Sequence, residues 1–321
     1  MSEVTVGRGD AQPRADGPGV AETSVRLSVV IVNWNTVDLL RACLLSMDAD
    51  YLGRADCEVI VVDNHSADGS PDMVEREFAG RVTLMRMSEN LGFSGGNNVA
   101  LRVARGEYVV LLNSDTEVCG DALWQMCDYL DANDRVGALG ARLLNPDGSV
   151  QMSCRSFPSY RTALFHRKSI ITRLFPGNRF SREYLMSGSD HEQTMEVDWV
   201  IGACLMTRRT VIDEVGLLDD GFFMYAEDVD WCYRMRRAGW TVEYFPDAVV
   251  MHHYEKSSGK APFRMNFERH RSMWRFYYKH YSRGIVLVDL ATLMGIAARC
   301  VLNGVKDSLR MLGRGERRAN S

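Results

Sequence analysis

The chain has 321 residues, of which 46% are hydrophobic and 25% are charged, a composition that is average for a folded protein and excludes wholesale disorder. Its length fits two ordinary domains or one large α/β domain with an appendage. Thirty-eight basic residues against 42 acidic ones give a net charge of -4. The protein therefore offers no general attraction to nucleic acid, and any anion site must be built locally.

The cysteines and the N-terminus bear on the cellular compartment. Eight cysteines are scattered without any C-x-x-C pair, which is typical of reduced, buried thiols in a cytosolic protein. Residues 1–25 lack the apolar core of a signal peptide and are predicted to be a disordered tail. The nearest approach to an uncharged apolar stretch of about 18 residues is 285–298, which contains Asp289, so no membrane span is predicted.

From Leu27 onwards, short β-branched runs alternate with helical patterns. The predicted strands are 27–32, 57–62, 81–87 and 107–112, and the predicted helices are 37–47, 70–78 and 94–104. Ser70, followed by Pro71, is expected to cap the second helix, and Ser94 the third. Such alternation indicates a parallel sheet with right-handed crossovers, which is a nucleotide-binding type of α/β layout up to about residue 144.

The pattern is less regular in the second half. After the turn at 145–148, residues 150–195 are predicted to be loops that cover a site. We expect a strand at 197–207, a helix at 227–238, short strands at 241–245 and 249–251, and helices from 263 onwards. The predicted organisation is a tail (1–25), an α/β catalytic domain (26–262) with a nucleotide-binding half (26–144) and an acceptor half (145–262), and a helical C-terminal region (263–321).

Polar side chains follow three of the predicted strands at the point where each strand ends. Any one of them could be a helix cap, but ligands of open α/β sheets bind outside the carboxyl ends of the strands. Three such groups at one edge therefore predict a nucleotide site. The residues are Asn33 and Asn35 after the first strand, Asp63 after the second, and Asn113, Ser114 and Asp115 after the fourth.

A nucleoside diphosphate needs a partner for its base, a close backbone approach and a cation for its phosphates. Asp63 can accept a hydrogen bond from the imide N–H of uracil or thymine. The stretch from Asn90 to Asn98 places three glycines before a helix, which lets the backbone approach a ligand. Asp115, with Asn113 beside it, offers hard oxygens that suit Mg²⁺ or Mn²⁺ and leave positions for phosphate and water.

The second half supplies candidate acid and metal chemistry. Glu227, Asp228 and Asp230 open a predicted helix, where acids commonly complement the helix dipole. The aromatic residues 222–225 before them would hold these acids against a buried surface, where a raised pKa suits a general base. His252 follows a strand, and beside a metal site it is a plausible ligand.

Other enzyme motifs fit less well. The stretch 92–96 satisfies the G-x-S-x-G pattern of hydrolases, but Ser94 lies seven residues past Met87 and not on the turn directly after the strand. The dinucleotide-binding fingerprint fails because no glycine occurs between Leu27 and Leu52, and there is no Walker A loop.

The order of these motifs resembles the family 2 glycosyltransferases with the GT-A fold, and most closely their bacterial rhamnosyltransferase-like branch. The resemblance covers about 27–281. It rests on SVVIVNWN at 28–35, VVDN and SADG within 61–69, NLGF and Asn97 within 90–97, LNSDT at 112–116, WVIG at 199–202, EDVDW at 227–231, and His252.

The resemblance implies roles for individual residues. Asp63 would bind the nucleotide base, Asp115 and His252 would be the metal ligands, and Asp228 would be the catalytic base beside Glu227. Asn113 stands where the family's D-x-D motif has its first acid, which leaves one strong carboxylate ligand and the choice between Mg²⁺ and Mn²⁺ open. The implied donor site comprises Asn33, Asn35, Asp63, Asn90, Gly92, Asn97, Asn113, Ser114, Asp115 and Trp199.

The implied reaction is an inverting transfer of rhamnose or a similar hexose from dTDP or UDP to a hydroxyl of a glycan or lipid-linked acceptor, in cell-envelope or exopolysaccharide synthesis. Two alternatives remain. A sugar nucleotidyltransferase normally carries a Gly-rich basic loop after its first strand, whereas 33–40 has no Gly, Lys or Arg. A non-catalytic sugar-nucleotide-binding subunit is disfavoured because the acids and His252 are all present.

The C-terminal region bears on the acceptor. Basic and aromatic residues alternate from 264 to 283, and a polar stripe follows on an otherwise apolar helix, formed by Asp289, Thr292, Arg299, Asn303, Lys306 and Arg310. One interpretation is a helix packed on the catalytic domain or on a partner in a homodimer. The other is an interfacial helix that brings a cytoplasmic enzyme to a lipid-linked acceptor at the inner face of the plasma membrane. No nucleic-acid partner is expected.

Overall fold

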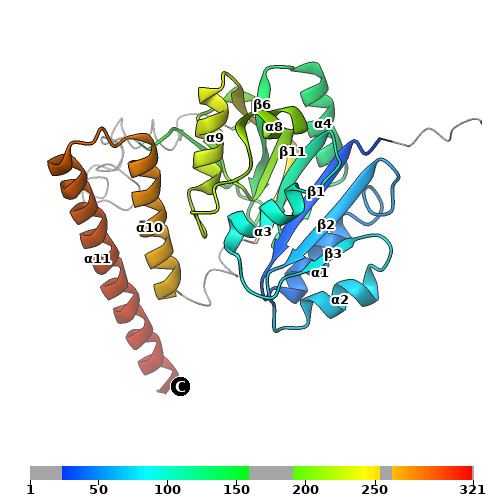
Figure 1. Ribbon diagram of the computed structural model, residues 1–321. Coiled ribbons are helices and arrows are strands. Elements are labelled where there is room, and N and C mark those ends of the chain that lie inside the picture. Colours follow the sequence, from blue (N-terminus) through cyan, green and yellow to red (C-terminus); the bar gives the residue numbers. More distant parts are fainter. Residues whose placement is uncertain (1–23, 159–190, 254–261, 320–321) are drawn as a thin grey trace, which may run out of the picture.

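The computed structural model describes residues 24–158, 191–253 and 262–319 of the chain (Figure 1). Most of the expected tail (1–25) and of the expected site-covering loops (150–195) therefore lies outside the described residues. Within the described part, one large sheet has helices on both faces, and a pair of long helices lies to one side of it (Figure 1).

The first half of the chain forms the parallel part of the sheet, in the strand order β3-β2-β1-β4. The register pairs Asn33 with Asp63 and Val32 with Asn113, so the carboxyl ends of β1, β2 and β4 meet at one edge. The elements are β1 (Leu27–Asn33), α1 (Val37–Ser46), β2 (Cys57–Asp63), α2 (Ser70–Glu77), β3 (Thr83–Arg86), α3 (Gly92–Leu101) and β4 (Tyr108–Asn113).

The second half makes the sheet mixed. The elements are β5 (Thr116–Val118), α4 (Ala122–Ala132), β6 (Val136–Leu144), β7 (Cys154–Arg155), β8 (Met195–Glu196), β9 (Trp199–Val200), β10 (Cys204–Arg208), α8 (Arg209–Val215), α9 (Glu227–Arg237) and β11 (Thr241–His252). β10 lies antiparallel between β4 and β6, and β11 is parallel to β6. β5 and β8 pair antiparallel with β11, while β7 and β9 form a separate two-stranded sheet.

The core lies on both faces of the sheet, as the nearly continuous apolar strands require. Val29 and Ile31 of β1 pack in one cluster with α1, α2 and α4. Val30, between them, points to the other face and packs in a second cluster with α3, α8 and α9. This layering fixes both the edge where the parallel strands end and the helix that carries the candidate acids.

Several local predictions are wrong, each for an identifiable reason. The strand at 197–207 is two strands, β9 and β10, because the chain turns at 202–203. The strands 241–245 and 249–251 are one strand, β11, whose register shifts between Phe245 and Val249, around a proline that cannot donate to the ladder.

The two expected serine caps are also displaced. Gly69, with a φ of 82°, occupies the N-cap position of α2, and Ser70 is the first residue of the helix. α3 begins at Gly92, so Ser94 lies inside its first turn, with its buried hydroxyl lacking a hydrogen-bond partner.

The chain ends in two helices, α10 (Pro262–His280) and α11 (Val286–Ala319), which lie side by side at the left of Figure 1. α10 contacts the segment before α9, because Ser272 Oγ donates to the carbonyl oxygen of Met224 at 2.9 Å. α11 runs back along α10, where Asn266 Nδ2 donates to the carbonyl oxygen of Cys300 at 2.9 Å.

One segment of α11, Val286–Ser308, is long and apolar enough to cross a membrane by length and composition alone, with a mean hydropathy of 1.6 and none of its window buried. The sequence predicts no span because Asp289 interrupts the apolar run. In the structure the Asp289 carboxylate accepts hydrogen bonds from Tyr277 Oη at 2.6 Å and Ser282 Oγ at 2.8 Å. The charge that excluded a span therefore faces α10, and the outer surface of the helix stays apolar.

Candidate active site

The candidate base-binding residue, Asp63, is buried at the edge where β1 and β2 end. Asn33 Nδ2 donates to Asp63 Oδ1 at 3.0 Å, and the backbone N–H of Ser66 donates to Asp63 Oδ2 at 2.9 Å. The Asn33 amide is itself fully engaged, since its oxygen accepts from Thr36 Oγ1 at 2.6 Å. The structure thus places Asn33 as a buried support that orients Asp63.

Asn35 ties the loop after β1 to the loop after β2. Its Oδ1 accepts from the N–H of Ala67 at 2.7 Å, and its own N–H donates to Ser66 Oγ at 2.9 Å. Asn35 has a positive φ of 55°, which asparagine tolerates better than most residues. The two loops therefore form one rigid polar rim around Asp63.

The glycine-rich segment approaches protein backbone closely, whereas the sequence predicts an approach to ligand. Gly92 has a φ of 75°, and a Cβ there would lie 2.2 Å from the carbonyl oxygen of Phe223. Asn90 Oδ1 accepts from the Gly92 N–H at 2.9 Å, and Asn97 Nδ2 donates to the carbonyl oxygen of Phe93 at 2.8 Å. Glycine is needed because the start of α3 meets the segment that leads into α9.

The candidate metal ligands meet because β11 ends beside β5. The register pairs His252 with Thr116, and His252 Nε2 lies 3.4 Å from Asp115 Oδ1. Asn113 Nδ2 is 3.5 Å from the same imidazole nitrogen, so Asn113 turns its amide nitrogen, and not its oxygen, towards His252. Ser114 Oγ lies 3.0 Å from Thr36 Oγ1, which links this motif to the rim after β1.

Gln151 is a site residue that the sequence did not reveal. Its Nε2 donates to the carbonyl oxygen of His252 at 2.7 Å and to Asn145 Oδ1 at 2.8 Å. Its Oε1 therefore faces His252 Nδ1, at 2.9 Å, and fixes the imidazole proton on Nδ1. With the proton on Nδ1, Nε2 is the nitrogen that would bind a metal ion, and it is the one that lies 3.4 Å from Asp115.

Asp115 and His252 together suit a hard or borderline divalent cation. In the described part of the chain, no three His, Cys, Asp or Glu side chains converge as a metal site, and Asp115 and His252 are a pair. Mg²⁺ is usually held by one or two carboxylates, with substrate phosphates and water completing the shell. An imidazole nitrogen beside the carboxylate also suits Mn²⁺.

The candidate base, Asp228, lies two hydrogen bonds from the metal motif. Its Oδ2 accepts from the N–H of Gly202 at 3.1 Å. The next residue, Ala203, accepts at its carbonyl oxygen from the N–H of Asn113 at 2.9 Å. The antiparallel insertion of β10 beside β4 produces this arrangement, and it brings acids from the second half of the chain to the edge built by the first half.

The backbone before Asp228 is strained. Tyr225 and Ala226 have positive φ values of 71° and 66°, a conformation that costs non-glycine residues about 1–3 kcal/mol each. The turn aims Glu227 and Asp228 into the structure, and Glu227 is buried. Strain of this kind is retained where the surrounding structure requires a side chain at one position.

The two neighbouring carboxyls have different environments. Burial raises the pKa of Glu227 well above its ordinary value, the charge of Asp228 adds to this rise, and Glu227 Oε2 has no hydrogen-bond partner. Burial also raises the pKa of Asp228, but the N–H groups of Gly202 and Val229 and the charge of Arg155 oppose that rise. Asp228 therefore ionises before Glu227, as a base beside a protonated neighbour would.

Asp230, the third acid of this helix, has a structural role. It is fully buried, yet its pKa is lowered, because ion pairs with His280, Lys279 and Arg234 outweigh the effect of burial. These contacts fasten α10 to α9.

Trp199 lies on β9, outside the main sheet. Its indole Nε1 donates to the carbonyl oxygen of Ser156 at 3.0 Å, and the guanidinium of Arg155 lies 5.6 Å from its ring centre. Trp199 lies three residues before Gly202, whose N–H donates to Asp228, so this pair lies towards the acid side of the site. Arg155, like Gln151, comes from the stretch that the sequence predicts as irregular loop.

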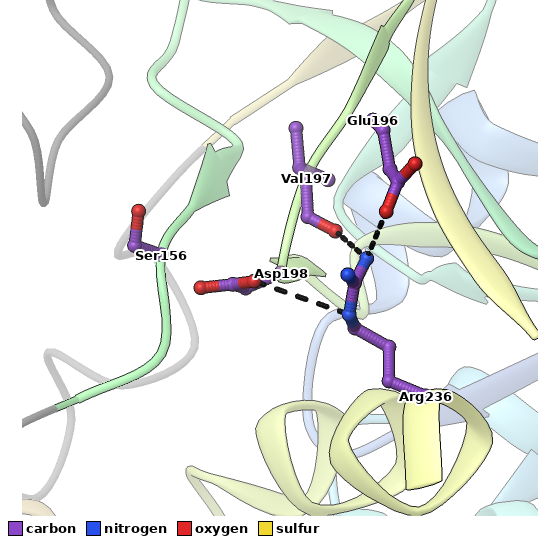
Figure 2. Close-up of a pocket in the computed structure, with 5 residues that line it drawn as sticks. All are labelled: Ser156, Glu196, Val197, Asp198 and Arg236. Carbon is purple, nitrogen blue, oxygen red and sulfur yellow. Dashed lines mark hydrogen bonds and ion pairs between the residues drawn. The ribbon is translucent and has the colours of Figure 1, made fainter. Parts of the chain in front are cut away.

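Two hollows elsewhere on the surface do not contain this chemistry. One, of about 240 Å³, is lined by Ser156, Glu196, Val197, Asp198 and Arg236 (Figure 2). Arg236 Nη1 already donates to Glu196 Oε1 at 2.7 Å and to the carbonyl oxygen of Val197 at 3.1 Å (Figure 2). The other, of about 360 Å³, is lined by Tyr233, Arg234, Arg237, Lys279 and His280. None of the predicted site residues lines either hollow.

Comparison with known proteins decides the family. Residues 28–216 match the model of glycosyl transferase family 2. The chain belongs to this family. The glycosyltransferase is 30% identical, over 70% of its length and 75% of the relative, to the N-acetylglucosaminyl-diphospho-decaprenol L-rhamnosyltransferase of Mycobacterium tuberculosis. It is 27% identical, over 58% of its length and 69% of the relative, to the rhamnosyltransferase WbbL of Escherichia coli.

Solved structures confirm the predicted GT-A fold of the glycosyltransferase. The mannosyltransferase PcManGT of Pyrobaculum calidifontis, solved with GDP-Man and Mn²⁺, superposes with a TM-score of 0.54 at 20% identity. The match covers 92% of the glycosyltransferase and 81% of that chain. The predicted family and its rhamnosyltransferase-like branch are confirmed as well.

Proposed function

We propose that this glycosyltransferase carries out a metal-dependent, inverting transfer of rhamnose or a similar hexose from a dTDP or UDP donor to a hydroxyl of a glycan or lipid-linked acceptor. The observation that carries the proposal is the position of Asp228, two hydrogen bonds from the Asp115–His252 pair. A base and a cation site on adjoining segments can act on opposite sides of one anomeric carbon.

Asp228 takes the proton of the acceptor hydroxyl as its oxygen attacks the anomeric carbon. The bond from that carbon to the diphosphate breaks on the opposite face, and its electron pair leaves with the diphosphate. A divalent cation held by Asp115 and His252 would neutralise the charge that develops on this leaving group. A single displacement without a covalent intermediate inverts the anomeric configuration.

The donor class rests on Asp63 and on the relatives. A buried carboxylate held by Asn33 and Ser66 can accept the imide N–H that uracil and thymine share and guanine presents differently. Rhamnose is favoured because the relatives from Mycobacterium tuberculosis and Escherichia coli are rhamnosyltransferases. The alternative of a nucleotidyltransferase loses support, since the family match covers the whole nucleotide-binding half.

Thermal shift with nucleoside diphosphates tests the donor proposal. We expect UDP and dTDP to raise the melting temperature in the presence of Mn²⁺ and GDP to have a much smaller effect. At a ligand concentration of about 100 times Kd, binding adds about 2.7 kcal/mol to stability. Stabilisation by GDP alone would contradict the role of Asp63.

The acceptor proposal is supported by the polarity of α11. Asp289 and Asn303 lie on its half-buried side, whereas Leu287 and Val301 on its outer side are 80% and 66% exposed. A surface helix of a soluble protein shows the opposite arrangement. With Arg283 and Lys306 exposed near the two ends of this apolar surface, we propose that it lies against an anionic bilayer, at the inner face of the plasma membrane where a lipid-linked acceptor would be found.

Vesicle flotation separates a membrane surface from a homodimer interface. We expect the protein to float with anionic vesicles at low salt, and a Leu287→Asp, Val301→Asp double variant to remain at the bottom of the gradient. Val103→Asp, which changes an exposed apolar residue of the catalytic domain, is the matched control and should float. A stable dimer that does not float would instead assign this surface to a second copy of the chain.

A further inference from the structure

Several buried polar atoms without partners lie on segments that neighbour Asp228. Such atoms are rare in native proteins, and each one calls for an explanation, such as strain, a catalytic role, or a bound water or ion. In the part of the chain that the structure describes, five of the eight residues with such an atom lie on segments next to Asp228. They are Ser94, Ser153, Arg155, Tyr225 and Glu227.

Arg155 is the cation of this cluster. Its Nε is buried without a hydrogen-bond partner, and its guanidinium lies 5.6 Å from the centre of the Trp199 ring. The strand register pairs these two residues directly. Arg209, by contrast, donates to the carbonyl oxygens of Leu101 and Ala104. Arg155 is held by an aromatic face and keeps donors for another group.

The backbone segment 199–203 connects the metal motif, Asp228 and Arg155 in that order. Asn113 bonds to Ala203, and Asp228 bonds to the neighbouring Gly202. Further along the same segment, the N–H of Ile201 donates to the carbonyl oxygen of Ser153, and Trp199 pairs with Arg155. The donor diphosphate belongs at the Asp115 end of this series. A general base must contact the acceptor hydroxyl. Arg155, which lies on the side of Asp228 away from the metal motif, is therefore expected to face the acceptor.

We propose that Arg155, held against Trp199, binds the phosphate group through which the acceptor sugar is joined to its carrier. The planar guanidinium matches two phosphate oxygens at once, which a neutral side chain or a lysine cannot do. This inference rests on the proposed transfer to a carrier-linked acceptor and adds the chemistry by which that acceptor is recognised.

Two synthetic acceptors that differ only in the phosphate test this subsite. One is an alkyl hexoside, and the other carries the same hexose on an alkyl diphosphate. Binding of each to the full chain is measured without donor by calorimetry, for the wild type and for Arg155→Gln. We expect Arg155→Gln to weaken binding of the diphosphate compound about 10- to 100-fold, because a charge-assisted hydrogen bond contributes that much, and to leave the alkyl hexoside unchanged. Arg155→Lys should recover part of the loss.

Arg236→Gln is the matched control, because it removes a nearby guanidinium whose donors are already taken by Glu196 and Val197. It should bind both compounds like the wild type. Equal losses for the two compounds in Arg155→Gln would overturn the subsite, as would a weaker affinity for the donor nucleotide alone. Because binding is measured without turnover, failure of the subsite and failure of the proposed transfer can be told apart. If the wild type transfers no sugar but still binds the diphosphate compound more tightly than the alkyl hexoside, only the proposed transfer is contradicted.

Discussion

Asp228→Asn is expected to lower kcat by about 10²- to 10⁴-fold, the usual contribution of a general base, with donor affinity unchanged. Asparagine fills the same space and keeps one oxygen for the N–H group of Gly202 or of Val229, each of which donates to a different oxygen of the carboxylate. It cannot take the acceptor proton. Steady-state kinetics with saturating donor, together with calorimetry of donor binding, separates the two effects.

The dependence of kcat on pH gives a second test of the role of Asp228. Burial raises the pKa of Asp228, so the acid limb of kcat should fall at a higher pH than for an ordinary aspartate. Activity is lost as pH falls through that pKa, because the protonated carboxyl cannot act as a base. The limb should vanish in the residual activity of Asp228→Asn. Asp213→Asn, the same change at an exposed position of α8, should keep both the limb and the rate. Wild-type turnover by Asp228→Asn would show that another group is the base.

The polar edge of the sheet could be predicted because it follows from local rules. Parallel strands end together, so Asn33, Asp63 and Asn113 had to meet once the alternation of strands and helices was recognised. The acids of α9 were recognised from their aromatic lead-in, but their place beside Asn113 depends on β10 entering antiparallel between β4 and β6. No local pattern encodes that insertion.

Gln151 and Arg155 were missed for a related reason. Their roles come from contacts with His252 and Trp199, residues 101 and 44 positions away, and the stretch around them lacks periodicity. In α11 the sequence showed a polar stripe but not which side of the helix it faces. The hydrogen bonds from Tyr277 and Ser282 to Asp289 settle this, and they turn the apolar side outwards.

Asp115→Ala is expected to abolish the dependence of donor binding on the metal ion. Calorimetry with UDP or dTDP, with and without Mn²⁺, should show tighter binding with the ion for the wild type and no difference for the variant.

Removing the Gln151 side chain should weaken metal binding without abolishing it. Gln151→Leu keeps both metal ligands but frees the imidazole of His252 to rotate or change tautomer. The loss in metal affinity should be about 10- to 100-fold, as for other residues that orient a metal-binding histidine.

Glu117→Gln, on β5, supplies the control, because Glu117 lies two residues from Asp115 and its carboxylate contacts His253 Nε2 at 2.6 Å, away from the His252 pair. It should retain the effect of Mn²⁺. If Asp115→Ala also retained it, the cation would have to be held elsewhere, and the link between Asp228 and a neighbouring cation would lose its basis. If Asp115→Ala lost the effect of Mn²⁺ but Gln151→Leu kept the metal affinity of the wild type, His252 would bind the ion well in either tautomer. Asp115 would then remain the main contact of the ion.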